Sequence, residues 1–370
     1  MITTHGQSTT SAHYRRMGGQ ECEQIHLASL EILERVGIAV HDERARSILA
    51  DNGGRVDGVR VRLPAYRVEE ALAHAPKQIR LFDRNGRVAM RAGGYNSYFG
   101  GGSDCLNVLD HRTGVRRRAR LDDTREAVRL MDALPEVDFV MSAFLPEDVD
   151  QNVYDRYQME VMLNGTTKPI VFVSPDFLGC VAAVDMCEAV AGGPEAFRER
   201  PFATCYINVT SGLICNEEAT QKTIYLAEKG LPLLYIPLNA GGVNSPTTTA
   251  GCMASMNAGT LLGLVLAQLV RPGTPVGVEN MTESANGIAW SMAIAPVAGI
   301  AAAVGAAVEE QDRVAVADRA DPDVDIEGGQ VHAVVGDRRG GDAGGLHEPV
   351  LSLAVGGEVG AHQPTSRVLC

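Results

Sequence analysis

The sequence is poor in the residues that many enzymes use for metal binding and covalent catalysis. No histidine lies between His111 and His332, so this stretch cannot form a histidine-rich metal site or a Ser-His-Asp triad. No expected strand ends in a lysine, which disfavours Schiff-base chemistry. Dinucleotide-binding and phosphate-binding loop motifs are also missing. The remaining residues suit a protein that holds a small molecule while another component supplies the reactive group. The lysines are Lys77, Lys168, Lys222 and Lys229.

The charge balance indicates which partners the protein has, and the cysteines indicate its cellular compartment. A net charge of −13 argues against nucleic acid or an anionic membrane as the main partner and leaves room for a cationic substrate. The eight cysteines show no CxxC spacing, and Cys180 and Cys187 are spaced as on one helix face. We therefore expect reduced thiols, no metal site and a cytoplasmic protein. Residues 1–19 contain no apolar run, which predicts no secretory signal.

One long uncharged stretch, residues 250–270, stands out from the rest of the chain. Pro246 and three threonines precede it, and a threonine hydroxyl can cap the first free N–H groups of a helix. Its length allows a transmembrane helix, but Asn257, Thr260 and Gln268 interrupt it. We therefore favour a buried helix of a soluble domain. Arg-Pro-Gly ends the helix, and a short apolar strand follows that finishes in a carboxylate.

Short apolar strands alternate with helices from residue 121 onward. Such unalternated strands are buried on both faces and must be parallel. The repeat of strand and helix predicts an α/β fold, a (β/α)8 TIM-type barrel that is incomplete at its C-terminus, and a doubly wound open sheet is the alternative. The predicted strands are residues 138–142, 169–174, 203–209, 233–237 and 276–279.

The composition divides the chain into four parts. We expect a disordered start over residues 1–20, an N-terminal appendage of helices and hairpins over 21–120, the barrel over 121–308 and an atypical tail over 309–370. Within the appendage, the sequence Arg-Asn-Gly at 84–86 predicts a hairpin turn. The glycine-rich stretch 93–103 has two interpretations, a loop that approaches a ligand or a flexible loop that closes the bottom of the barrel.

Polar residues follow several of the predicted strands. In a parallel barrel the loops at the carboxyl ends of the strands meet over the mouth, where chemistry takes place. Glu279 is the strongest candidate, because a carboxylate there can neutralise an alkylammonium group while aromatic rings add cation–π attraction. Each residue also has a structural alternative: Asn208 could cap a loop and Glu279 could pair with an arginine. The candidate substrate-binding residues are Glu279, Asn208, Thr210, Asn239, Ser174, Tyr98 and Phe99, and no catalytic residue is assigned.

Several blocks of the sequence occur together in a characteristic order. They are Leu27–Val40, Arg62–Pro64, Leu81–Arg84, Leu121–Thr124, Pro246–Gly251, Asn257-Ala258 and Leu264–Val270 before Pro272-Gly273. In this order the blocks resemble the trimethylamine methyltransferase family of corrinoid-dependent methyltransferases, and the resemblance covers roughly residues 21–290.

The resemblance implies a function. Family members resemble barrels that hold a methylated amine at the mouth and pass a methyl group to the Co(I) of a corrinoid (cobalamin) carried on a separate small protein. The expected partners are thus a small methylated amine and a corrinoid protein, with no corrinoid bound covalently to this chain. The trimethylamine enzymes carry pyrrolysine, which this sequence lacks. This favours a quaternary amine such as glycine betaine, with trimethylamine as the alternative; homo-oligomerisation stays open.

The C-terminal part departs from this pattern. After Trp290 the sequence contains no Phe, Tyr, Trp, Lys or Asn, and from about Glu309 the apolar residues show no sustained period. A reading-frame change that starts between residues 294 and 308 would explain this composition, and a natural disordered or diverged tail is the alternative. If the frame changed, the pyrrolysine position cannot be read from this sequence. Two other function classes therefore stay open, namely a truncated inactive relative and an unrelated small-molecule barrel enzyme or binding module.

Overall fold

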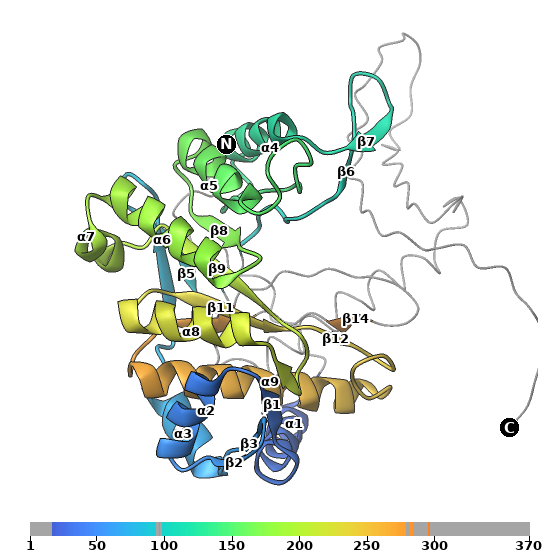
Figure 1. Ribbon diagram of the computed structural model, residues 1–370, viewed down its shortest axis with the longest axis vertical. Coiled ribbons are helices and arrows are strands. Elements are labelled where there is room, and N and C mark those ends of the chain that lie inside the picture. The colour runs from blue at the N-terminus through green and yellow to red at the C-terminus, as the bar shows by residue number, and fades with distance from the viewer. Residues whose placement is uncertain (1–16, 94–95, 97, 279–281, 284–294, 297–370) are drawn as a thin grey trace, which may run out of the picture.

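The computed structural model describes residues 17–93, 96, 98–278, 282–283 and 295–296 (Figure 1). Most of the expected disordered start, the tail from residue 309 and the candidate residue Glu279 lie outside the described residues. The interpretation of the tail as a frame change and the boundaries of the four predicted parts stay predictions.

A parallel sheet forms the centre of the molecule. Its strands β8 (Ile170–Val173), β9 (Ala203–Val209), β11 (Leu233–Pro237) and β13 (Val276–Val278) lie side by side in the order in which the chain makes them. The short strand β15 (Ala295–Pro296) adds to β13 in the antiparallel direction. The predicted α/β class and the predicted parallel strands are confirmed.

Two further segments extend this sheet beyond β8. Val140 bridges Ile170 in parallel, and Phe139 in turn bridges Gly100 in parallel. The second of these segments lies in the glycine-rich stretch, which the sequence suggested to be a loop. A side chain on Gly100 would overlap the ring of Phe139. The glycine is therefore required for the two segments to approach, and it hides the apolar pattern by which a strand is recognised.

Helices cover one face of the sheet, and each packs on the next along the chain (Figure 1). Val140, Ile170, Cys205 and Tyr235 point into the core that these helices share with the sheet. The short α7 (Pro194–Glu199) packs against α6. The covering helices are α4 (Leu121–Ala133), α5 (Tyr154–Gly165), α6 (Phe177–Ala191), α8 (Glu217–Lys229) and α9 (Thr249–Val270).

Helix α9 is the apolar stretch recognised in the sequence. It is long and apolar enough to cross a membrane, but 89% of its most apolar window is buried inside the protein, which confirms the expected core helix. Thr248 caps it as predicted, because its hydroxyl accepts a hydrogen bond of 3.2 Å from the N–H of Gly251. Any side chain on Gly263 would overlap the ring of Tyr235, so this glycine lets α9 lie directly on β11.

The N-terminal region packs against the other side of α9. Helices α1, α2 and α3 all contact it, and β1 joins β3 on one side and β10 of the central region on the other. Ser29 Oγ donates to the carbonyl of Ala254 at 3.0 Å. The elements are α1 (Gly19–Glu31), the π-helical turn η1 (Ile32–Val36), β1 (Ile38–Val40), α2 (Glu43–Asp51), β2 (Arg55–Asp57), β3 (Arg60–Arg62), α3 (Ala65–His74) and β10 (Ile214–Cys215).

Two hairpins lie at the two ends of the parallel strands, which we call the amino-terminal edge and the carboxyl-terminal edge of the sheet. The hairpin of β4 (Ile79–Phe82) and β5 (Val88–Ala92) turns at residues 84–86, as predicted. Phe82 N–H donates to the carbonyl of Pro201 at 2.9 Å, just before β9 begins, so this hairpin closes the amino-terminal edge. The hairpin of β6 (Asn107–Leu109) and β7 (Arg116–Arg118) leaves the sheet at the other edge. There β12 (Asn239–Ala240) pairs with β14 (Thr282–Glu283).

Candidate functional site

The carboxyl-terminal edge of the sheet is the region in which the sequence predicts the substrate. The face of the sheet turned away from the helices is apolar, with Val171, Tyr206, Leu234 and Ile236 in one buried cluster. Asn208 follows on the same face of β9, paired with Ile236, and its side chain is exposed. Asn208 therefore places an accessible amide at the end of an apolar surface.

Asn239 lies on the other face, toward α9. Its Oδ1 accepts a hydrogen bond of 2.8 Å from the N–H of Gly212, and its Nδ2 donates to Ser255 Oγ at 3.0 Å and to the carbonyl of Cys252 at 3.2 Å. The side chain is buried. The structure therefore separates Asn239 from Asn208 and uses its amide to fix the loop after β11 onto α9. Its role in substrate binding stays a prediction.

Ser174 and Thr210 both take part in local hydrogen bonds after their strands. Ser174 is buried, its hydroxyl donates to the carbonyl of Asp176 at 3.0 Å, and its own carbonyl accepts from Lys222 Nζ at 2.6 Å. Thr210 is exposed, and its hydroxyl donates to Asn216 Oδ1 at 3.3 Å. These contacts shape the loops after β8 and β9, and of the two hydroxyls only that of Thr210 lies on an exposed residue.

Tyr98 and Phe99 lie at the opposite edge. Tyr98 is buried in the apolar cluster, and its hydroxyl accepts a hydrogen bond of 2.8 Å from the N–H of Arg91 in β5. Phe99 is 67% exposed, and its N–H donates to Asp138 Oδ2 at 2.8 Å, where the adjacent parallel segment begins. The structure thus does not bring these two rings together with Asn208, and Glu279 lies outside the described residues.

Acidic residues that the sequence analysis did not single out lie where the first three parallel segments end. Asp155 is only 4% exposed, and its Oδ1 pairs with Arg156 at 3.1 Å. Its Oδ2 accepts no hydrogen bond from the described residues and lies where a side chain on Gly179 would be. Burial raises the pKa of the Asp155 carboxyl, although the Arg156 guanidinium opposes the shift.

Asp104 and Tyr154 lie near Asp155 at the same edge. Burial raises the pKa of Asp104, although a hydrogen bond from Ser103 opposes it. Burial, followed by the charges of Asp104, Asp155 and Asp176, raises the pKa of Tyr154 to about 12. Tyr154 therefore stays neutral at physiological pH. Where the acidic side chains around Tyr154 are ionised, their charge attracts cations.

The backbone is strained at the same edge. Asp104 and Ala143 have φ values of 63° and 62°, in the left-handed region that residues with a Cβ rarely adopt. Phe144 N–H donates to the carbonyl of Ser142 at 2.7 Å, so the chain turns tightly around Ala143. An aspartate tolerates this conformation, whereas no local signal in the sequence predicts it for an alanine.

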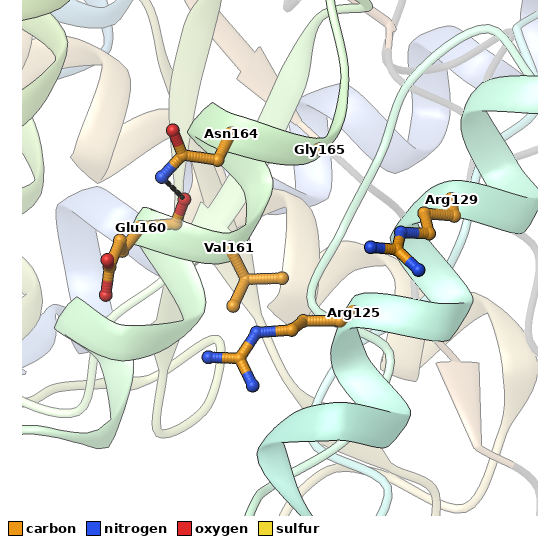
Figure 2. Close-up of a pocket in the computed structure, with 6 residues that line it drawn as sticks. All are labelled: Arg125, Arg129, Glu160, Val161, Asn164 and Gly165. Atoms are coloured by element: carbon orange, nitrogen blue, oxygen red, sulfur yellow. Dashed lines mark hydrogen bonds between the residues drawn. The ribbon is translucent and has the colours of Figure 1, made fainter.

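A shallow cavity of about 220 Å³ lies elsewhere, between α4 and α5. Figure 2 shows Arg125 and Arg129 extending from α4, while Glu160, Val161 and Asn164 come from α5. None of the candidate substrate-binding residues lines it. Within the part of the chain that the structure describes, no group of three His, Cys, Asp or Glu residues could hold a metal ion.

Comparison with known proteins settles the family. The model of the trimethylamine methyltransferase (MTTB) family matches residues 4–287. The chain belongs to this family. It is 30% identical to trimethylamine methyltransferase MttB of Desulfitobacterium hafniense over 259 residues, covering 70% of this chain and 52% of the relative.

Two further relatives include one that is named for a different substrate. Glycine betaine methyltransferase of Desulfitobacterium hafniense is 27% identical over 266 residues, covering 71% of this chain and 55% of the relative. Trimethylamine methyltransferase MttB of Methanosarcina thermophila is 29% identical over 271 residues, with coverage of 71% and 56%. The chain spans about half the length of the curated relatives it matches, and those relatives are methyltransferases.

Proposed function

We propose that this chain transfers a methyl group from a methylated amine to the Co(I) of a corrinoid carried on a separate protein. The observation that supports this most strongly is the family match over residues 4–287, which contains every strand of the parallel sheet from Ile170 to Val278. The relatives that are named for trimethylamine and for glycine betaine provide the substrate class.

We also propose that the sheet belongs to a (β/α)8 barrel. The parallel segments follow one another in chain order with no reversal among the described strands. A doubly wound sheet reverses its strand order at a switch point and carries helices on both faces. Here the helices from α4 to α9 pack in sequence on one face, which favours a sheet that curls into a barrel.

The residues at the carboxyl-terminal edge fit a methylated cation. The apolar face around Tyr206 and Ile236 suits methyl groups, and the exposed amide of Asn208 can donate to a carboxylate such as that of a betaine. Where Asp104, Asp155 and Asp176 around Tyr154 are ionised, their charge favours a cationic nitrogen over a neutral one. The reduced corrinoid supplies the nucleophile, and this chain orients the amine and excludes water.

A quaternary amine is the proposed substrate, and trimethylamine is the alternative. The C–N bond of a quaternary amine breaks with its electrons on nitrogen, so the leaving group is a neutral amine that needs no proton from the protein. We propose Glu279 as the partner of the cationic nitrogen, in line with its position directly after β13.

A methyl-transfer assay tests the function. The full chain is mixed with a reduced corrinoid carrier and either glycine betaine or trimethylamine, and methylation of cobalt is followed by its visible absorption. We expect transfer from glycine betaine. No transfer from any methylamine, by a chain that shows one cooperative thermal transition, would exclude the proposal, whereas a chain without a transition would be an inactive relative.

Glu279→Gln tests the proposed cation partner. The change removes the charge and keeps the shape, so we expect KM for the amine to rise about tenfold with little change in stability. Steady-state kinetics with glycine betaine measure this. Kinetics equal to those of the unmodified chain would rule out Glu279 as the cation partner.

We propose the cytoplasm as the compartment of this reaction, because its reducing conditions agree with free cysteine thiols. Among the described residues the cysteines are free, and even Cys180 and Cys205, whose sulfur atoms lie 3.9 Å apart, form no disulfide. A reduced corrinoid likewise needs reducing conditions.

A further inference from the structure

The hairpin of β6 and β7 carries a concentration of positive charge on an acidic protein. The chain has a net charge of −13, yet the hairpin, residues 107–118, contains four arginines and one acidic residue. The arginines are Arg112, Arg116, Arg117 and Arg118, and the acidic residue is Asp110.

Charged contacts at its base hold this hairpin in one conformation. Arg117 donates to both carboxylate oxygens of Asp123, at 2.7 and 2.8 Å, and also to Asp110 at 3.2 Å. The same Asp110 accepts from the N–H of Arg112 at 3.0 Å, and Gly114 completes the turn with a φ of 70°. A two-stranded hairpin is marginal alone, so these contacts keep it ordered before any partner arrives.

The outward face of the hairpin is basic and apolar together. Arg116 and Arg118 lie on one face of β7 with Leu109 opposite Arg116, and all three are exposed. Within the described part of the chain, neither of these arginines forms an ion pair, in contrast to Arg117. Leu109 is 41% exposed and Val115, in the turn, 58%. Arginine beside exposed apolar side chains is typical of a protein interface.

The position of the hairpin links it to the proposed reaction. It leaves the sheet just after Cys105, which bridges Phe144 where the first two parallel segments end. In Figure 1 it projects from the body on the same side as β12, at the carboxyl-terminal edge. A macromolecule that approaches this edge to collect a methyl group would therefore meet Arg116 and Arg118.

We propose that the face formed by Leu109, Arg116 and Arg118 docks an acidic protein surface. The inference rests on the proposed function in one respect: the acidic protein is the corrinoid carrier, which this face orients over the edge that holds the amine. Opposite charges speed the encounter and fix its register, and the exposed leucine and valine add apolar contact area.

The test is a pair of matched charge reversals. Arg116→Glu combined with Arg118→Glu changes the proposed face, and Arg80→Glu combined with Arg87→Glu makes the same change of charge on the exposed hairpin at the opposite edge. Titration calorimetry measures Kd for a holo corrinoid carrier of a glycine betaine system. We expect the first variant to bind about tenfold more weakly at low salt and the second to bind like the unmodified chain.

A second readout separates docking from chemistry. Methyl transfer to free cob(I)alamin needs no carrier, so the Arg116→Glu, Arg118→Glu variant should keep this rate while KM for the carrier rises. Equal Kd values for both variants would overturn the docking face. If the unmodified chain methylates neither acceptor, the proposed function fails, and the calorimetry still decides whether this face binds the carrier.

Discussion

The two edges of the parallel sheet are built for different purposes. At the amino-terminal edge, the β4–β5 hairpin inserts Leu81 and Met90 into the apolar cluster and seals it. At the carboxyl-terminal edge the same face ends in the exposed Asn208, and this edge also carries the strained Ala143 and the buried carboxylate of Asp155. One edge contributes stability, and the other retains strain and charge that a sheet does not need in order to fold.

The largest expected effect lies at the sealed edge. Met90→Ala removes a fully buried side chain and leaves a cavity, so we expect the free energy of unfolding to fall by about 2–5 kcal/mol. Urea denaturation followed by circular dichroism measures the loss. Met186→Ala is the matched control and should cost less, because Met186 is only half-buried. Equal losses would show that the hairpin does not seal the cluster.

At the charged edge, Gly179→Ala tests the packing of the buried carboxylate. The new methyl group would overlap Asp155 Oδ2, and we expect a loss of about 1–3 kcal/mol as the two helices adjust. Combining it with Asp155→Ala removes the overlapping group, so the double variant should lose less than the sum of the single losses. Additive losses in thermal denaturation would contradict the contact.

Asn208→Ala should weaken substrate binding and leave the stability nearly unchanged. Its side chain is exposed, so we expect the free energy of unfolding to change by no more than about 0.5 kcal/mol. Loss of the amide should raise KM for glycine betaine about tenfold, the cost of one hydrogen bond to a charged group. Asn85→Ala, an exposed asparagine at the sealed edge, is the control and should leave KM unchanged. Identical KM values for both variants would remove Asn208 from the site.

The smallest effect is a dependence on pH. The pKa of Asp155 is raised in the folded protein, so its ionisation opposes folding. Below the unfolded pKa of about 3.9 both states are protonated and this penalty is absent; it grows as the pH rises through the folded pKa. Asp155→Asn should therefore raise the free energy of unfolding, relative to the unmodified chain, more at pH 7 than at pH 4. A difference in unfolding free energy that does not vary with pH would contradict the raised pKa.

Local signals in the sequence predicted much of the fold. Strands β9 and β11 begin and end at the predicted residues, 203–209 and 233–237, because unbroken apolar runs between turn residues have few alternatives. The cap at Thr248 and the turn at Gly86, with a φ of 81°, follow from the chemistry of single residues.

The parts that could not be predicted depend on contacts between distant residues. Gly100 belongs to the sheet because it packs against Phe139, which no local pattern indicates. Asn208 lies one residue before the end of β9 and Asn239 lies just after β11, so the two positions look alike in the sequence. The loop after β11 nevertheless folds back and turns the Asn239 amide toward α9. Ala143 adopts a positive φ that its own identity disfavours. Position at a strand end is therefore insufficient to assign a residue to the substrate site.

The contact of α9 with the N-terminal helices has a consequence for biosynthesis. A ribosome releases α1, α2 and α3 before it releases α9, so their apolar surfaces are available when this apolar helix emerges. A chain deprived of those first helices would present α9 to chaperones, other chains or a lipid bilayer instead. The first three helices therefore act as an intramolecular chaperone for a long apolar helix that follows them.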